Sequence, residues 1–322
     1  MIYALLCIAA GFFALNMGGS NFGASFAAAH GGRVITARKA QLLFTVFVFL
    51  GAVTLGRPVA ATLGGRIISP SLLKPDVVFA VIAAAALSIF IANTLHVPQS
   101  TSLVTVGALL GAGLRAGGIN GGTFLYLAPF WIALPAIGYF VTFFLGKVVY
   151  PPRKSNFWIY EKLVNHTDRL EFFVIAASCY NAFSVGANNA ANAAGPLAGA
   201  NVIGVMPALA ASSVLFGAGS FVFHHSLRTT GKKIVPLGLL TATIICLVTG
   251  TLMIAASLLG VPQSFVMIKV AAVMAIGGLK NGHRTTFANP ATKKTYITWI
   301  VTPLIAVILS YVMTGVVYAV YR

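Results

Sequence analysis

Acidic residues are nearly absent from this sequence. Among its 322 residues there are 21 Lys and Arg but only four Asp and Glu. The four acids are Asp76, Glu161, Asp168 and Glu171, and none of them lies well inside an apolar segment. The apolar part of the chain therefore offers no carboxylate that could hold a cation.

Charged residues of both signs are also scarce. They make up 8% of the chain, whereas about 25% is typical of soluble proteins. Hydrophobic residues make up 58% and form long runs without strand-like alternation. This pattern predicts an all-α polytopic membrane protein rather than a transmembrane barrel. The three cysteines lack metal-ligand spacing, and no nucleophile–base pair, metal cluster or phosphate loop is recognisable, so we expect neither an enzyme nor a cofactor.

The net charge of +17 would suggest nucleic-acid binding in a soluble protein. Here the basic residues mostly occupy short loops between apolar runs, as the positive-inside rule expects. We therefore predict a multi-pass protein of the plasma (inner) membrane, with the lipid bilayer and no nucleic acid as partner. The N-terminus lacks a basic region and a clear cleavage site, so it is expected to be the first membrane helix and not a signal peptide.

Two motifs recur in the same order. Val-Pro-Gln-Ser occurs at 97–100 and again at 261–264, each time after an apolar span. A segment rich in Asn or Gly precedes it at a similar distance, at 16–25 and at 184–196. This order indicates an internal repeat. The predicted units are a first repeat at 1–146, a cytoplasmic linker at 147–170 and a second repeat at 171–322.

The basic residues predict that the two repeats are inverted. The turn at 33–39 holds three basic residues and its counterpart at 200–203 holds none. The loop after the first Val-Pro-Gln-Ser segment holds only Arg115, whereas its counterpart at 280–294 holds four basic residues. Equivalent loops should thus lie on opposite sides of the membrane, as in many secondary transporters. Five crossings per half would put 33–39, 147–170, 224–233 and 280–294 in the cytoplasm and both termini outside. Re-entrant hairpins at the Val-Pro-Gln-Ser segments are the alternative to five crossings.

The segment at 184–196 carries three Asn, two Gly and one Pro within an apolar region. Unsatisfied backbone groups cost several kcal/mol in lipid, so irregular backbone is expected there only beside a cavity, an ion or a ligand. Close helix packing through small residues is the alternative. Three carboxamides within five positions favour a ligand site.

These motifs resemble the inorganic phosphate transporter (PiT) family. Gly186–Pro196 is similar to the Gly-Ala-Asn-Asp signature of the family, and Gly18–Ser25 resembles its degenerate first copy. Pro98–Ser102 resembles the Pro-x-Ser-Thr-Thr hairpin, and Thr230–Ile234 resembles another family stretch. The resemblance covers nearly the whole chain. It implies an oxyanion transporter whose two inverted repeats meet, through broken helices or hairpins, at a midplane site, with a homodimer as a possible assembly.

The departures from the family pattern concern carboxylates. The family carries Asp at the positions of Asn21 and Asn189 and usually an acid at the position of Val48, and in sodium-coupled members the Asp carboxylates take part in cation binding. Their loss implies the branch that carries sulfate, without sodium coupling.

Phosphate carries one or two protons at pH 7 and benefits from a carboxylate acceptor, whereas sulfate offers acceptors only and would leave such a carboxylate unpaired. Amides, hydroxyls, backbone N–H groups and a lysine suit sulfate.

Helix N-termini provide further donors. Pro98 and Pro262 are expected to begin helical segments, which places polar residues where free N–H groups and the helix dipole bind oxyanions. Capping of their own helices is a compatible alternative for the Ser and Thr residues. The candidate substrate-binding residues are Asn21, Ser25, Gln99, Ser100, Thr101, Ser102, Asn188, Asn189, Asn192, Gln263, Ser264 and Lys269.

Lys269 lies in an otherwise apolar segment, Phe265–Gly278. A charge at the bilayer centre costs about 2.5–3.5 kcal/mol, and a bound dianion would compensate it. Snorkelling to an interface and a lowered pKa are the alternatives.

We expect proton-coupled sulfate uptake, with phosphate transport or a passive anion channel as alternatives. Lys269 is the proposed proton carrier, ahead of a relay through His30, His96, His224 or His225.

Overall fold

The computed structural model describes residues 2–94, 99–223 and 238–321. These residues form an almost entirely helical bundle, in which eight helices are long and apolar enough to cross a membrane. The all-α membrane architecture predicted from composition is confirmed.

Each half contributes one set of helices. The first half contains α1 (Ile2–Gly31), α2 (Ala37–Leu55), α3 (Arg57–Ala61), α4 (Pro75–Thr94), α5 (Thr101–Ala116) and α6 (Gly121–Val149). A connecting helix, α7 (Phe157–Asn165), follows. The second half contains α8 (Thr167–Asn189), α9 (Ala191–Gly199), α10 (Val205–Val222), α11 (Leu239–Leu258), α12 (Phe265–Asn281), α13 (His283–Ala288) and α14 (Pro290–Tyr321).

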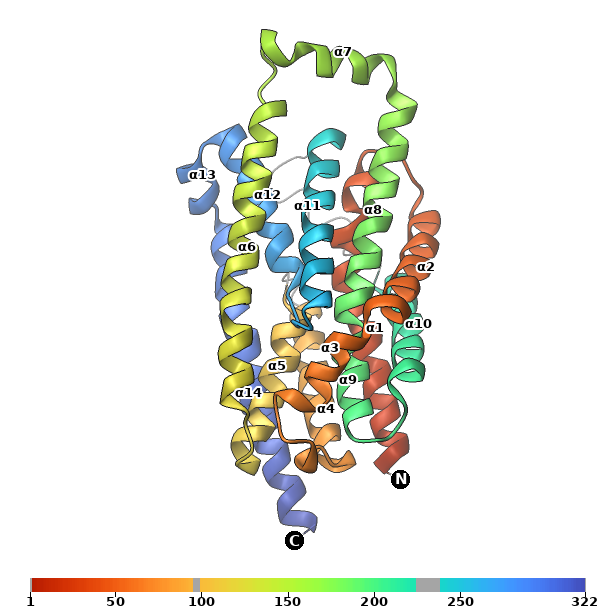
Figure 1. Cartoon of the computed structure of the whole chain (residues 1–322), viewed down its shortest axis with the longest axis vertical. Coiled ribbons are helices and arrows are strands. Elements are labelled where there is room, and N and C mark those ends of the chain that lie inside the picture. Colours follow the sequence, from red (N-terminus) through yellow and green to blue (C-terminus); the bar gives the residue numbers. More distant parts are fainter. Residues whose placement is uncertain (1, 95–98, 224–237, 322) are drawn as a thin grey trace.

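Equivalent helices of the two halves run in opposite directions. Figure 1 shows α7 at one end of the bundle and both chain termini at the other. Helix α1 starts at the end with the termini, whereas α8 starts at the α7 end. Helix α6 ends beside α7, whereas its counterpart α14 ends at the C-terminus. This arrangement supports the predicted inverted repeat. Of the predicted cytoplasmic segments, 224–233 lies outside the described residues.

The contacts between the halves follow the same symmetry. Helix α1 packs on α10, and α2 packs on α8. A Cβ atom added to Gly51 or to Gly186 would lie 1.9 or 2.0 Å from a backbone carbonyl oxygen of the facing helix. Gly18 and Gly219 make the same reciprocal contact between α1 and α10, at 2.2 and 2.0 Å. Gly18 corresponds to Gly186 and Gly51 to Gly219 under one shift of 168 residues, the same shift that relates Asn21 to Asn189.

Helices α5 and α12 are short. They have 16 and 17 residues, which gives lengths of about 24 and 26 Å, less than the roughly 30 Å of a hydrocarbon core. They begin next to each other, because the Ser102 hydroxyl donates a hydrogen bond of 3.0 Å to the Gln263 carbonyl oxygen. From there α5 runs toward the end with the termini and α12 toward the α7 end (Figure 1). The structure therefore favours the hairpin alternative, α4–α5 and α11–α12, over five complete crossings per half.

Two local expectations need correction. The irregular backbone expected at 184–196 is confined to Ala190, between α8 and α9, and the related motif at 16–25 is helical throughout, within α1. Its polar side chains find partners without unwinding, because they donate to carbonyl oxygens one turn earlier, as Asn21 does to Met17 at 2.9 Å. Pro262 also does not begin α12, which starts three residues later and is capped by Ser264. Pro98 lies outside the described residues.

The glycine contacts predict a stability effect. Gly186→Ala should destabilise the fold by roughly 1–3 kcal/mol, because the new methyl group would overlap the backbone of α2. We expect a lower apparent melting temperature of the purified protein in detergent. Gly121→Ala is the control, since a Cβ there meets nothing within 4 Å. Equal melting temperatures for the two variants would contradict the proposed close contact of α8 with α2.

Candidate functional site

Asn189 and Ser102 join three helices at the centre of the bundle. The Asn189 amide nitrogen donates to the Asn21 amide oxygen at 3.0 Å, which links α8 to α1. The Ser102 hydroxyl lies 3.3 Å from the Asn189 amide oxygen and 3.0 Å from the Gln263 carbonyl oxygen. All four residues are buried. Both Asn motifs and both hairpin tips therefore meet at one place, as the sequence predicts.

Asn188 holds the second hairpin. Its amide oxygen accepts a hydrogen bond of 2.9 Å from the Gln263 backbone N–H. Its amide nitrogen donates to the Val261 carbonyl oxygen at 3.0 Å and to the Ser257 hydroxyl at 3.1 Å. The segment between α11 and α12 is thus fixed by a side chain of α8 rather than by secondary structure of its own.

Asn192 holds the start of the first hairpin helix. Its amide nitrogen lies 3.3 Å from the Thr101 hydroxyl and 3.2 Å from the Ser102 hydroxyl. Asn192 is the first polar residue after the interruption at Ala190, so the break in α8–α9 lies directly beside this contact. We call the connected set the central network; its members are Asn21, Thr101, Ser102, Asn188, Asn189, Asn192 and Gln263.

Several buried polar atoms in and beside the central network have no partner in the described structure. Both amide atoms of Gln263 are unpaired, as are the amide oxygens of Asn192 and Gln99. Each such atom costs about 1–3 kcal/mol when it stays unpaired. Gln99 differs from its repeat counterpart Gln263, because its amide nitrogen donates to the Ile89 carbonyl oxygen at 2.9 Å. Gln263 is therefore the better placed of the two to bind a ligand through its amide.

Three predicted residues have local partners. The Ser100 and Ser264 hydroxyls cap their own helices, accepting from backbone N–H groups at 3.1 and 3.2 Å. The Ser25 hydroxyl donates to the Asn21 carbonyl oxygen at 3.0 Å. The capping alternative thus holds for both serines, and their direct contact with a ligand stays a prediction.

Lys269 is not joined to the central network by any contact of the described residues. Its side chain is only 8% exposed. The ammonium group lies 3.1 Å from the Cys246 sulfur and 5.8 Å from the centre of the Phe265 ring. The structure therefore brings together most of the predicted site but leaves Lys269 in a neighbouring environment.

Sequence reasoning missed several polar partners. Ser257 accepts from Asn188, and Asn93 donates to the Asn16 carbonyl oxygen at 3.0 Å. One signal could have found part of this set, because polar residues recur along α8 and α9 at helical spacing. They are Ser178, Asn181, Ser184, Asn188 and Asn192. Of the histidines considered for proton transfer, His96, His224 and His225 lie outside the described residues, and the His30 ring contacts the nearby Ile35 carbonyl oxygen at 3.1 Å.

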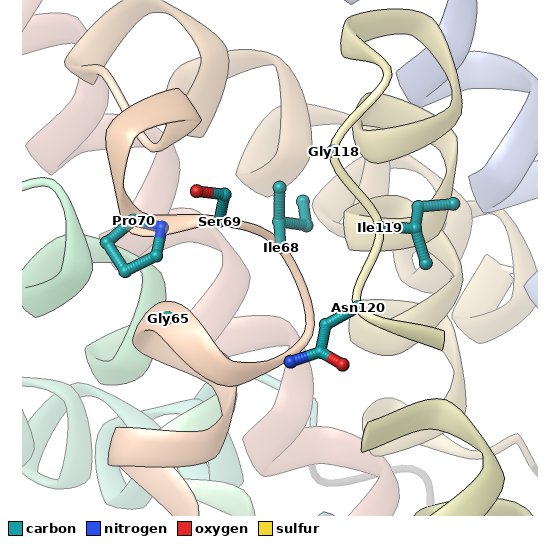
Figure 2. Close-up of a pocket in the computed structure, with 7 residues that line it drawn as sticks. All are labelled: Gly65, Ile68, Ser69, Pro70, Gly118, Ile119 and Asn120. Atoms are coloured by element: carbon teal, nitrogen blue, oxygen red, sulfur yellow. The ribbon is translucent and has the colours of Figure 1, made fainter. Parts of the chain in front are cut away.

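A surface pocket of about 340 Å³ lies elsewhere (Figure 2). It is formed where the chain before α4 meets the turn between α5 and α6. Its lining residues are Gly65, Ile68, Ser69, Pro70, Gly118, Ile119 and Asn120. None of these is a predicted site residue, and the Asn120 side chain caps α6 through the Thr123 N–H at 3.2 Å.

Known proteins resemble this chain in sequence or in fold. The sulfate permease CysP of Bacillus subtilis is 32% identical over 306 residues, which cover 94% of this chain and 85% of that protein. A putative phosphate permease of Pyrococcus furiosus is 26% identical over 382 residues and covers 92% of both chains. A solved structure titled as the sodium-dependent phosphate transporter matches with a TM-score of 0.86 at 24% identity, over 99% of both chains, which shows a shared fold. The predicted resemblance is thereby confirmed, and with it a multi-pass location in the plasma membrane. Because the family model matches residues 17–310, the chain belongs to the phosphate transporter family.

Proposed function

We propose that this protein is a secondary-active transporter that takes up sulfate, coupled to protons and not to sodium. One observation carries the proposal. The central network joins both halves through amides and hydroxyls, contains no carboxylate and leaves the Gln263 amide unpaired. Such a site offers hydrogen-bond donors to a ligand that has only acceptors.

The amide pair between Asn21 and Asn189 supports sulfate as the substrate. A carboxylate at either position would face a dianion and repel it, whereas an amide keeps the site neutral and can donate. The third departure from the family pattern, Val48, is an apolar side chain buried against α8, so no charge stands at this position either. The similarity to a protein named a sulfate permease points in the same direction.

The hairpin tips are the proposed moving parts. The hydrogen bond from Ser102 to the Gln263 carbonyl connects one tip to the other across the centre of the bundle. Access from either side requires a displacement of one tip, while the glycine contacts of α1 with α10 and α2 with α8 hold a scaffold. A bound anion would replace the lost contact with bonds to the freed amides and hydroxyls.

Lys269 is the proposed carrier of the coupling proton. A buried ammonium without a carboxylate partner is costly, and a nearby dianion would compensate its charge. All four acids of the chain lie near the ends of the bundle or in the linker. Binding of sulfate and of a proton would then reinforce each other.

Phosphate is the second candidate substrate, and a specific feature favours it. The unpaired amide oxygens of Asn192 and Gln99 could accept the O–H group of hydrogen phosphate. Competition between the two anions decides between the candidates, because phosphate as an equal competitor for uptake would favour the second.

Transport itself is tested with the purified protein in proteoliposomes. Uptake of radiolabelled sulfate should saturate, rise with an inward proton gradient and stay unchanged when sodium replaces potassium. Saturable uptake of phosphate but not sulfate would reject sulfate as the substrate. Flux that follows voltage without saturation would instead indicate an anion channel.

The amide chemistry is tested by Asn189→Asp. The added carboxylate should lower sulfate uptake by about tenfold or more, because it repels the dianion and removes a donor. Asn201→Asp is the control, since Asn201 is exposed in the turn after α9. Sulfate uptake at the wild-type rate in Asn189→Asp would show that this position does not face the anion.

Proton coupling is tested by two variants of Lys269. Lys269→Ala should lose most sulfate uptake, because the counter-charge disappears. Lys269→Arg keeps the charge but cannot release its proton at accessible pH, so it should lose the stimulation by a proton gradient. If Lys269→Arg retains full gradient-driven uptake, another group carries the proton.

A further inference from the structure

A second buried polar cluster lies between α8, α11 and α12. The Thr249 hydroxyl donates to the Asn181 amide oxygen at 3.0 Å, which links α11 to α8. Cys246 lies one turn before Thr249 on α11, and its sulfur lies 3.1 Å from the Lys269 ammonium of α12. We call this set the lateral cluster; its members are Ser178, Asn181, Cys246, Thr249 and Lys269.

The lateral cluster contains groups that lack a partner in the described structure. The Asn181 amide nitrogen and the Ser178 hydroxyl are both unpaired, and both residues are fully buried. Ser178 lies one turn before Asn181, so the two side chains share a face of α8. Close packing of α11 fixes this region, because a Cβ on Gly250 would lie 2.6 Å from the Tyr180 ring and 3.3 Å from the Asn181 amide oxygen.

The chemistry of these groups suits an oxyanion. A buried ammonium, an amide N–H₂ and a hydroxyl can all donate hydrogen bonds, and no carboxylate of the chain belongs to the cluster. A buried cation without an anionic partner is costly, which a bound anion would relieve. Cys246 and Thr249 add polar atoms but no fixed charge.

The position of the lateral cluster follows from three helices independently. Asn181 precedes Asn188 on α8 by two turns, or about 10 Å toward the α7 end. Lys269 follows Ser264 by five residues, or about 7.5 Å, along α12, which runs toward the same end. Thr249 precedes Ser257 by eight residues, or about 12 Å, on α11. The cluster therefore lies between the central network and the end of the bundle that carries α7 and α13.

The inverted repeat provides an internal comparison. Matching Asn21 with Asn189 pairs Asn181 with Phe13 and Ser178 with Ala10. Matching Gln99 with Gln263 pairs Thr249 with Ala85, Cys246 with Ile82 and Lys269 with Thr105. The counterparts Phe13, Ala10, Ala85 and Ile82 are buried and apolar.

Thr105, the fifth counterpart, donates to the Thr101 carbonyl oxygen at 3.0 Å and so satisfies itself within its helix. At four of the five matched positions the fold is thus built with apolar residues, and the fifth, Thr105, needs no partner outside its own helix. Helix packing does not require the polar residues of the lateral cluster, so they point to a ligand.

We propose that the lateral cluster is a second oxyanion subsite, on the predicted cytoplasmic side of the central network. It holds the transported anion, sulfate or phosphate, between the central network and the cytoplasm, through Lys269, the Asn181 amide nitrogen and the Ser178 hydroxyl. The inference rests on the proposed transport function and adds a step to it. It assigns Lys269 to the lateral cluster and gives Asn181 and Ser178 a direct contact with the anion.

The test uses the full-length protein in proteoliposomes of known orientation, with sulfate offered at one face at a time. The main variant is Asn181→Asp, which keeps the acceptor for Thr249 but replaces the donor by a carboxylate. We expect the ratio of the KM at the cytoplasmic face to the KM at the extracellular face to rise by about tenfold. Ser178→Ala, which removes a hydroxyl without a partner, should raise the ratio in the same direction by a smaller factor.

Tyr180→Phe is the matched control. It removes the hydroxyl that pairs with Thr251 at 3.1 Å between the same two helices, outside the lateral cluster. The KM ratio should stay at the wild-type value in this variant.

The outcomes separate the subsite from the transport function. A wild-type protein that moves neither sulfate nor phosphate rejects both proposals. A wild-type protein that transports, together with an unchanged KM ratio in Asn181→Asp and Ser178→Ala, rejects the subsite alone. Equal increases of both KM values would also reject it, because they would place Asn181 at the central site or show a general defect.

Discussion

The hydrogen bond from the Asn189 amide to the Asn21 amide joins the two halves at the point where the hairpin tips meet. Around it, polar groups at membrane depth must find partners within the protein, because lipid supplies none. Asn188 and Asn192 meet this requirement by bonding to the hairpin tips rather than to their own helix. Under the proposed function, the side chains that satisfy each other in this structure are the ones that become available to the anion when a hairpin tip moves.

The replacement of carboxylates by amides changes what the centre can bind. A pair of Asp side chains at these positions would repel each other and would require cations, whereas two Asn side chains pair directly as donor and acceptor. Under the proposed function, the neutral centre receives a dianion without sodium. The charge that balances the anion then comes from Lys269, the buried cation nearest along α12 to the hairpin tip.

The helical membrane architecture and the convergence of the motifs at the centre could be predicted from the sequence, because composition and repeated motifs are visible there. The inversion predicted from the loop charges agrees with the opposite directions of α1 and α8, whereas the contacts of Gly51 and Gly186 between helices became visible only in the structure. The local backbone was harder to predict, since α1 stays helical through its Asn and Gly residues. Its side chains bond to carbonyl groups one turn earlier, a solution that residue types alone do not distinguish from unwinding. The separation of Lys269 from the central network depends on the rotation of α12 about its axis. This rotation could not be predicted from the sequence, because the residues around Lys269 are apolar on every face of the helix.

An exact inverted repeat would offer the anion the same surroundings on both sides of the centre. That equivalence is lost here, because one side has the apolar residues Phe13 and Ala85 where the other side has the polar residues Asn181 and Thr249. Under the proposed function, a protonated Lys269 draws the anion from the centre toward the cytoplasmic side. Such a cation would also hold the anion there and slow its release. Loss of the Lys269 proton to the cytoplasm would lower that affinity, so the same residue that attracts the anion would couple its release to the proton gradient.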